Sequence, residues 1–247
     1  MIAVSLPISS RAMKQIGVFV GAYLLYSAAR WITVGDFGAA KAHADWIMSL
    51  ERHLGVATEA SVQQALTGTW LLWILNHLYL AAQLIVVPGA LIFTYVRSRA
   101  IYARLRDTIL ATWMLAVPIY AAFPVAPPRL AGLGMADTVS RQAAVGLTGH
   151  STMFYNPYAA VPSLHCGFAF AIGIALAAAS RGPVFKALWL SWGPLVSLAV
   201  VATGNHYVFD IAAGLLIAAA GYLVGRLPRR LPTLLPAPRL ALSGETI

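Results

Sequence analysis

Charged residues and cysteines are both scarce in this chain of 247 residues. Only 10% of its residues are charged and 60% are hydrophobic, with a mean hydropathy of +0.74. An average soluble domain has about 25% charged residues, so the composition excludes an ordinary soluble enzyme, a disordered chain and a coiled coil. The single cysteine, Cys166, excludes an internal disulfide and a cysteine-based zinc site. A polytopic membrane protein remains, provided that the apolar residues form runs of about 20.

Acidic residues are also few, since 8 Asp and Glu stand against 17 Lys and Arg and give a net charge of +9. On a soluble protein such an excess would suggest a nucleic-acid partner. Here the cations lie between apolar runs, so we expect no nucleic acid and attribute the bias to the positive-inside rule.

Six apolar runs predict an all-α membrane protein with six transmembrane helices. They cover residues 16–34, 70–96, 109–125, 164–179, 184–202 and 208–227. The first run could instead be the apolar core of a cleaved signal peptide, but its continuation to Val34 favours a retained helix. Pro88 is expected to kink the second run. Residues 42–54 alternate polar and apolar positions at helical spacing, which predicts a short amphipathic helix on the membrane surface.

The loops between these runs predict an orientation. With the N-terminus inside, the predicted cytoplasmic segments hold 12 Lys and Arg and the opposite side holds 5. This bias predicts cytoplasmic termini and places residues 126–162 and 203–207 on the outer face. We expect one membrane domain over residues 1–227 and a disordered, proline-rich cytoplasmic tail over 228–247. The compact chain, rich in Ala and Arg, suggests a bacterial plasma membrane.

His206 and Asp210 stand four residues apart where the sixth run begins. This spacing puts both side chains on one helical face. A carboxylate beside an imidazole fixes its tautomer and prepares it as a nucleophile or base. The alternative is a plain hydrogen bond that closes the entrance of a helix.

A second polar cluster opens the fourth run at Pro162-Ser163-Leu164-His165. Ser163 is a good N-cap, and the amides that follow it form an anion site toward which His165 would point. Arg129, in a proline-rich loop, could present a fixed guanidinium to phosphate. Taken alone, these residues could equally be a capped helix and a cation at the lipid headgroups. Together with the His–Asp pair they suit phosphoryl transfer without a metal or other cofactor, since neither HExxH nor a carboxylate-rich cluster is present.

At these residues the sequence resembles the type 2 phosphatidic acid phosphatase superfamily over residues 70–225. Pro162–His165 is similar to its second motif and His206–Asp210 to its third. Four positions depart from the family pattern: Ala122 replaces a lysine, Leu130 a proline, Leu164 a glycine and Val200 an arginine. The stretches around Pro-Ser-Leu-His and Thr-Gly-Asn-His-Tyr resemble the inositol phosphorylceramide synthase branch of this superfamily.

The resemblance implies roles for individual residues. His206 would be the nucleophile that forms a phosphohistidine, Asp210 would orient it, and His165 would act as general acid and then as base. Phosphate would be held at Arg129, Ser163 and Leu164. A substrate pocket is expected from polar and aromatic residues near the predicted outer face, which are equally compatible with contacts between helices: Asn76, Tyr79, Asn156, Tyr158, Thr203 and Asn205.

The predicted function is therefore a membrane lipid phosphatase or an inositol or sugar-alcohol phosphotransferase. The substrate would be a phospholipid or prenyl phosphate, and the loss of two family cations fits a phosphodiester slightly better than a dianionic monoester. A transporter using Asn76, His77 and Gln83, or a non-catalytic scaffold, remains the alternative. Residues 41–59 would either cover the site or lie among the headgroups.

Overall fold

The computed structural model describes residues 10–142 and 156–226. In this part of the chain the regular structure is helical, with one isolated parallel bridge between Val125 and Ala159. The elements are α1 (Ser10–Ile32), α2 (Phe37–His53), α3 (Glu59–Leu66), α4 (Trp70–Ala81), the π-helix η1 (Ala82–Val86), α5 (Val87–Arg97), α6 (Arg99–Ala122), α7 (Thr138–Gln142), α8 (Leu164–Ala179), α9 (Pro183–Leu190), α10 (Trp192–Ala202) and α11 (Val208–Gly225). The predicted disordered tail lies outside the described residues.

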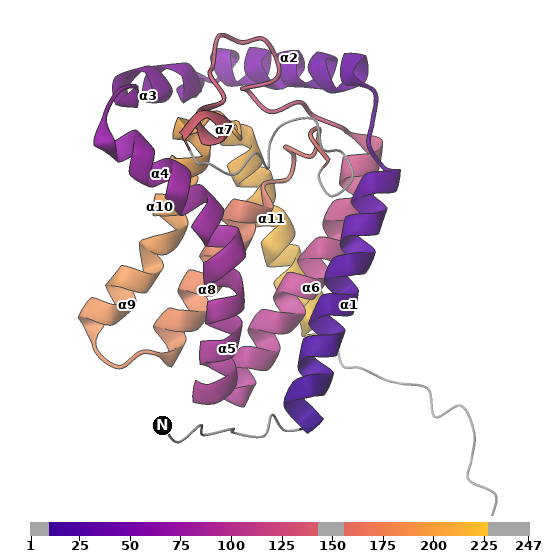
Figure 1. Ribbon diagram of the computed structural model, residues 1–247, viewed down its shortest axis with the longest axis vertical. Helices are drawn as coiled ribbons and strands as arrows, with labels where there is room; N and C mark the ends of the chain where they lie inside the picture. Colours follow the sequence, from indigo (N-terminus) through magenta and orange to yellow (C-terminus); the bar gives the residue numbers. More distant parts are fainter. Residues whose placement is uncertain (1–9, 143–155, 227–247) are drawn as a thin grey trace, which may run out of the picture.

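The helices form a bundle that is covered at one end (Figure 1). Helices α1, α6, α8 and α11 and the joined helices α4–α5 and α9–α10 run along the bundle, and α2, α3 and α7 lie at its upper end. Helix α2 turns away from α1 by 99°. Helix α11 returns to the lower end, since Gly225 meets Asp107 near the start of α6. The two described chain ends therefore lie at the same end of the bundle.

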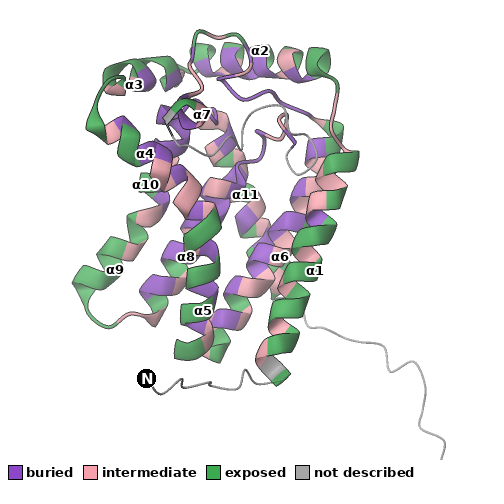
Figure 2. Cartoon of the chain, in the orientation of Figure 1, coloured by how far each residue is buried: buried purple, intermediate pink, exposed green. Residues whose placement is uncertain are grey.

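Three helical stretches in the described residues are long and apolar enough to cross a membrane, and the bent pair α1–α2 would add a fourth. The three stretches are Trp70–Arg97, Pro183–Ala202 and Val208–Gly225. Exposed residues occur all along the bundle helices (Figure 2). Large apolar residues are among them, including Leu24, Trp73, Ile92, Leu188, Leu216 and Leu223. A soluble monomer rarely exposes so large an apolar surface, so the chain is an integral membrane protein. The count of six spans, and the position of α2 on the membrane surface, stay predictions.

In two predicted spans the α-helix is interrupted at positions that hydropathy did not predict. The second run contains the π-helical turn Ala82–Val86. Helix α5 begins directly after it, and Pro88 is the second residue of α5. Proline has no N–H to continue the α-helical ladder, and a wider turn before it accommodates the loss. The fifth run divides at Ser191, with Pro194 in the first turn of α10, where proline is tolerated.

Helices α8 and α11 cross closely because both carry glycine at the contact. A Cβ on Gly214 would collide with the carbonyl oxygen of Ser163, and a Cβ on Gly167 would lie 2.7 Å from the carbonyl oxygen of Gly214. At the same crossing the backbone N–H of Ser163 donates to the carbonyl of Asp210 at 3.1 Å. The glycines thus let the amino ends of the two helices meet.

Candidate active site

The amino ends of α8 and α11 bring the two predicted motifs together beneath α2 and α3 (Figure 1). Helix α8 begins after Ser163, whose hydroxyl accepts the N–H of Cys166 at 3.4 Å, as the N-cap prediction required. Tyr120 donates its hydroxyl to the carbonyl of Pro162 at 2.9 Å and so fixes the chain that enters α8. The start of α8 is therefore held from both α6 and α11.

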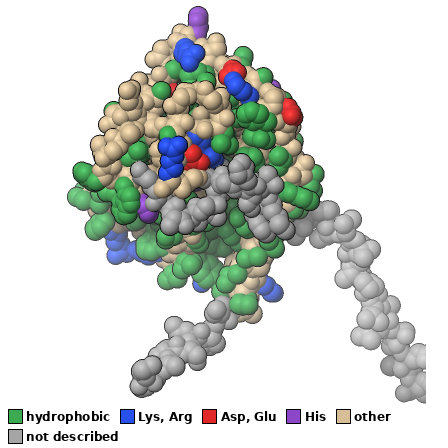
Figure 3. Space-filling view, turned by 45° about the horizontal axis from the view of Figure 1, so that its top comes forward, with side chains coloured by type: hydrophobic (Ala, Val, Ile, Leu, Met, Phe, Trp, Pro, Cys, Tyr) green, Lys and Arg blue, Asp and Glu red, His purple; other side chains and the backbone are tan. Residues whose placement is uncertain are grey.

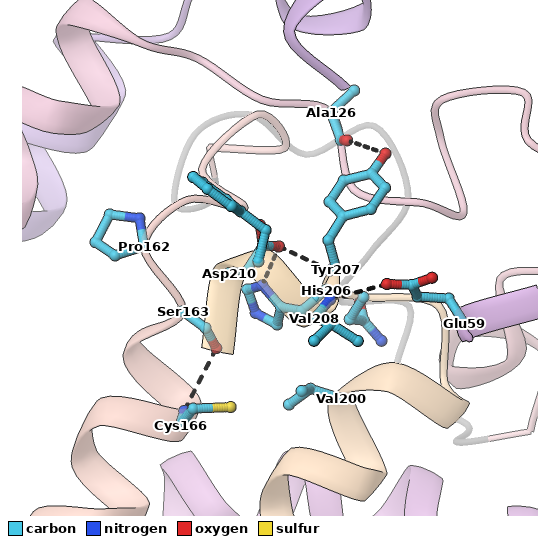
Figure 4. Close-up of polar contacts among 12 residues, drawn as sticks. Glu59, Ala126, Pro162, Ser163, Cys166, Val200, His206, Tyr207, Val208 and Asp210 are labelled. Atoms are coloured by element: carbon cyan, nitrogen blue, oxygen red, sulfur yellow. Dashed lines mark hydrogen bonds and ion pairs between the residues drawn. The ribbon is translucent and has the colours of Figure 1, made fainter. Parts of the chain in front are cut away.

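The imidazole of His206 is hydrogen-bonded to Asp210, which confirms the predicted contact (Figure 4). Nδ1 of His206 lies 3.0 Å from Oδ2 of Asp210, and the same oxygen accepts the backbone N–H of Tyr207 at 2.9 Å. Asp210 is fully buried. In the tautomer that carries its proton on Nδ1, facing the carboxylate, His206 has the lone pair of Nε2 for a substrate.

Burial lowers the pKa of His206 to about 3; the carbonyl of Ala160 opposes this shift and the positive charge of Arg129 supports it. The imidazole therefore stays neutral at physiological pH. A neutral imidazole with a fixed tautomer is the form that attacks phosphorus.

His165 faces His206 from the first turn of α8. The two rings are 6.0 Å apart between centroids and inclined by 55°. The ring of Tyr79, from α4, stacks on His165 at 4.2 Å and 15°, which fixes its orientation. Two imidazoles at this separation can act on opposite sides of one phosphoryl group.

Arg129 is buried and belongs to a polar network around the His206 loop. Its Nε donates to Oδ1 of Asn205 at 2.9 Å, and its Nη1 lies 3.0 Å from Oδ2 of Asp137. Asn205 in turn donates to the hydroxyl of Thr203 at 2.9 Å. Thr203 and Asn205, expected in the substrate pocket, thus position Arg129 beside His206.

The other expected pocket residues make contacts elsewhere. Asn76 accepts the hydroxyl of Thr138 at 2.8 Å. Asn156 donates its side-chain amide to the carbonyl of Arg30, and its own carbonyl accepts from the Arg30 guanidinium. Tyr158 packs against Phe37. Leu164 places its side chain in the apolar core, so that only its backbone could meet a phosphate. Of the predicted pocket, the structure brings Tyr79, Thr203 and Asn205 to the histidines.

Four charged residues near the site carried no signal in the sequence. Glu51 and Glu59 look like solvated positions of amphipathic segments, yet each is only 1% exposed. Asp137 pairs with Arg129. Arg30, at the last turn of α1, lies over the rings of Tyr26 and Tyr120 at 5.3 and 5.8 Å. The two glutamates are placed by partners 149 and 158 residues away along the chain, which no local pattern records.

The face above the site is polar at its centre. Basic and acidic side chains lie side by side there, and hydrophobic side chains gather mainly at the sides and the lower part of this view (Figure 3). In the described parts of the chain, no group of three or more His, Cys, Asp and Glu side chains is placed to hold a metal ion.

Comparison with known proteins gives one family and one fold. The model of the PAP2 superfamily matches residues 45–224, which is most of the chain. The crystal structure of Aquifex aeolicus LpxE shares the fold, with a TM-score of 0.50 and 18% identity over 68% of this chain and 91% of that one. The comparison with curated proteins gives no match. The family match covers Arg129, both histidines and Asp210, and the chain belongs to the PAP2 superfamily.

Proposed function

We propose that this protein transfers the phosphoryl group of a membrane lipid through a phosphohistidine at His206. The observation that carries the proposal is the facing pair of imidazoles, of which His206 is bonded to the buried carboxylate of Asp210 at 3.0 Å. Family membership supports a phosphatase-type enzyme acting on a lipid phosphate.

In the first step, the lone pair of Nε2 of His206 attacks phosphorus and the bond from phosphorus to the leaving oxygen breaks. The leaving oxygen takes a proton from His165, which must enter this step as the imidazolium and leaves it as the neutral imidazole. Positive charge develops on the imidazole of His206, and the carboxylate of Asp210 stabilises it through the proton on Nδ1. No electron carrier or further reactant is required.

In the second step, His165 takes a proton from the acceptor as general base. The acceptor oxygen attacks phosphorus, the bond from phosphorus to Nε2 breaks, and His206 is restored. Water as acceptor makes the protein a phosphatase, and a hydroxyl of inositol or another sugar alcohol makes it a phosphotransferase. The same two histidines serve both reactions.

The charges around the phosphoryl position support a phosphodiester over a dianionic monoester. Ala122 and Val200 stand where the family has cations, and the carboxylate of Asp137 offsets part of the charge of Arg129. A site with reduced positive charge stabilises a monoanion more readily than a dianion. This balance, with the Pro-Ser-Leu-His motif, favours a relative of inositol phosphorylceramide synthase.

The proposed enzyme is one domain over residues 1–227, with its termini in the cytoplasm and its site at the outer face of a bacterial plasma membrane. The excess of Lys and Arg at the predicted inner loops supports this orientation. The lipid would then reach the site from the outer leaflet.

Phosphoenzyme trapping tests the proposal. The purified chain in detergent is incubated with lipids labelled at phosphorus, including phosphatidate, phosphatidylinositol and a prenyl phosphate, with and without myo-inositol. We expect label on the protein that is labile to acid and stable to alkali, and its absence in His206→Ala. His53→Ala, which removes an exposed histidine of α2, is the matched control and should label normally.

The product identifies the acceptor. A labelled product that forms without myo-inositol, which is inorganic phosphate from a monoester and inositol phosphate from phosphatidylinositol, indicates transfer to water, whereas a labelled product that forms only when myo-inositol is added indicates a transferase. Equal labelling of His206→Ala and the unmodified protein would refute the role of His206. A His206→Ala variant that turns over substrate without label would refute the covalent mechanism altogether.

A further inference from the structure

The first turn of α11 is bonded by two glutamates that come from the opposite end of the sequence. The backbone N–H of Val208 donates to Oε1 of Glu59 at 2.8 Å, and that of Phe209 donates to Oε1 of Glu51 at 2.6 Å. Together with the N–H of Tyr207, which donates to Asp210, three successive backbone amides donate to carboxylates, and those of Tyr207 and Val208 can be followed in Figure 4. The glutamates therefore bind the segment that carries His206.

Neither glutamate is compensated by a cation. Both side chains are 1% exposed, and no ion pair found in residues 10–142 and 156–226 includes either of them. In the same residues, Oε2 of Glu51 and Oε2 of Glu59 have no hydrogen-bond donor from another group. Two adjacent, buried and fully ionised carboxylates would be strongly unfavourable. One proton held between them removes this cost and leaves a single negative charge at the positive end of the α11 dipole.

We propose that Glu51 and Glu59 form a proton-sharing carboxyl pair that positions the nucleophile His206. The pair is bonded to the amides that directly follow the His206–Tyr207 segment, so its geometry sets where the imidazole points. Glu51 and Glu59 touch no reacting atom and are positioning residues. This inference rests on the proposed function of His206. It adds that α2 and α3, which carry Glu51 and Glu59, help to position this histidine.

The electrostatic surroundings agree with one shared proton. The pKa of Glu51 is raised from 4.5 to about 8, first by burial and then by the hydrogen bond to Glu59 and the charges of Glu59 and Asp210, against the N–H of Phe209. The charged group that acts on the pair from α11 is Asp210; Tyr207 lies at the entry of α11, and the Arg129–Asp137 pair lies beyond His206. Asp210 is acidic, so it favours the protonated form of the pair.

The sign of the pH dependence follows from this raised pKa. The folded protein holds a proton that the unfolded chain releases near pH 4.5. The stabilisation is complete below that pH and is lost as pH rises through about 8. Above this range both carboxylates are charged, they repel each other, and the amide end of α11 shifts. Activity is therefore expected to fall as the pair loses its shared proton.

Glu51→Gln tests the pair without removing its bonds. The amide oxygen still accepts the N–H of Phe209, and the amide nitrogen donates permanently to Glu59. We expect activity within threefold of the unmodified protein at pH 7, and loss of the alkaline decline between pH 7 and 9. Asp45→Asn, which neutralises an exposed carboxylate of the same helix, should keep the decline. Glu51→Ala should lower kcat at least tenfold, with KM within threefold, in protein that remains folded.

A second measurement separates this inference from the proposed function. The quantity to measure is the melting temperature of the unmodified protein minus that of Glu51→Gln. This difference should fall by several degrees from pH 5 to pH 9, and its measurement needs no substrate. A constant difference would overturn the proton-sharing pair. An alkaline decline that persists in Glu51→Gln, or unchanged kcat in folded Glu51→Ala, would overturn its positioning role. Absence of turnover in the unmodified protein, with the expected melting behaviour, would refute the proposed function alone.

Discussion

The charge of Asp210 can be removed without removing its hydrogen bonds. In Asp210→Asn, the amide oxygen can take the place of Oδ2 and accept both Nδ1 of His206 and the N–H of Tyr207, which lie at 3.0 and 2.9 Å. The tautomer of His206 and the start of α11 are then preserved. What is lost is the carboxylate that stabilises the positive charge developing on His206 as phosphorus is attacked.

The size of the loss follows from the distance. Two unit charges about 4 Å apart, at an effective dielectric constant of about 20, interact by about 4 kcal/mol. This corresponds to roughly 10³-fold in rate. We therefore expect kcat of Asp210→Asn to fall about 10³-fold with little change in KM, because the charge acts mainly in the transition state.

The assay is the rate of phosphohistidine formation and of product release from the labelled lipid. Removing one charge from a fully buried position should not destabilise the fold, so the melting temperature should stay the same or rise. Asp36→Asn is the matched control, because Asp36 caps α2 at the N–H of Ala39 and asparagine caps equally well. If Asp210→Asn keeps kcat within threefold, Asp210 only caps α11 and the electrostatic reasoning is refuted.

Three further predictions concern the neighbours of the nucleophile. His165→Asn should lower kcat by about 10²-fold or more, the usual contribution of a general acid, measured in the same assay; near-normal turnover would exclude that role. Gly214→Ala should lower the melting temperature and activity, because its Cβ meets the backbone of α8, whereas Gly89→Ala has nothing within 4 Å and should be neutral; equal effects would contradict the close crossing. Asp137→Asn should raise kcat/KM for a monoester relative to a diester several-fold, by freeing charge on Arg129, and an unchanged ratio would contradict the charge argument.

Local patterns were sufficient to predict the contact between the two groups that the proposed mechanism uses first. The spacing of four between His206 and Asp210 predicts a contact within one helical turn, and the structure has it at 3.0 Å. The apolar run at 164–179 predicts α8 with its observed bounds. Both signals depend on the nearest turns of the chain, so no tertiary information was required.

The helix boundaries were less predictable where a helix extends beyond the apolar run that hydropathy identifies. Helix α6 begins at Arg99, ten residues before the predicted span at 109, because arginine is a good helix former that hydropathy places outside the membrane. The surface segment was predicted as one helix over 42–54, whereas the structure has α2 from Phe37 and a separate α3. Hydropathy thus predicts the length of the apolar segment, whereas capping residues and helix propensity determine where the helix itself begins and ends.

The supporting residues of the site could not be read from the sequence. Glu51 and Glu59 stand among polar residues of short amphipathic segments, where a charged side chain ordinarily faces water. Their burial depends on the docking of α2 and α3 against α11, which lies 158 and 149 residues away along the chain. The same is true of Asp137, whose partner Arg129 is buried by the His206 loop.

The arrangement explains why a phosphoryl site can be built with few cations. In the proposed mechanism, helix α8 offers its amino end to the phosphate, while the amino end of α11 is bonded to carboxylates and so is not an anion site. The amino ends of α8 and α11 therefore have different proposed roles, although both lie where the two helices cross. The positive end of the α11 dipole stabilises the buried carboxyl groups of Asp210 and the glutamate pair. In the proposed arrangement these acids in turn orient His206. Because negative charge surrounds the nucleophile and Arg129 is partly offset by Asp137, the site favours a substrate of low charge. The same acids that make His206 an effective nucleophile thereby restrict which phosphate it can accept.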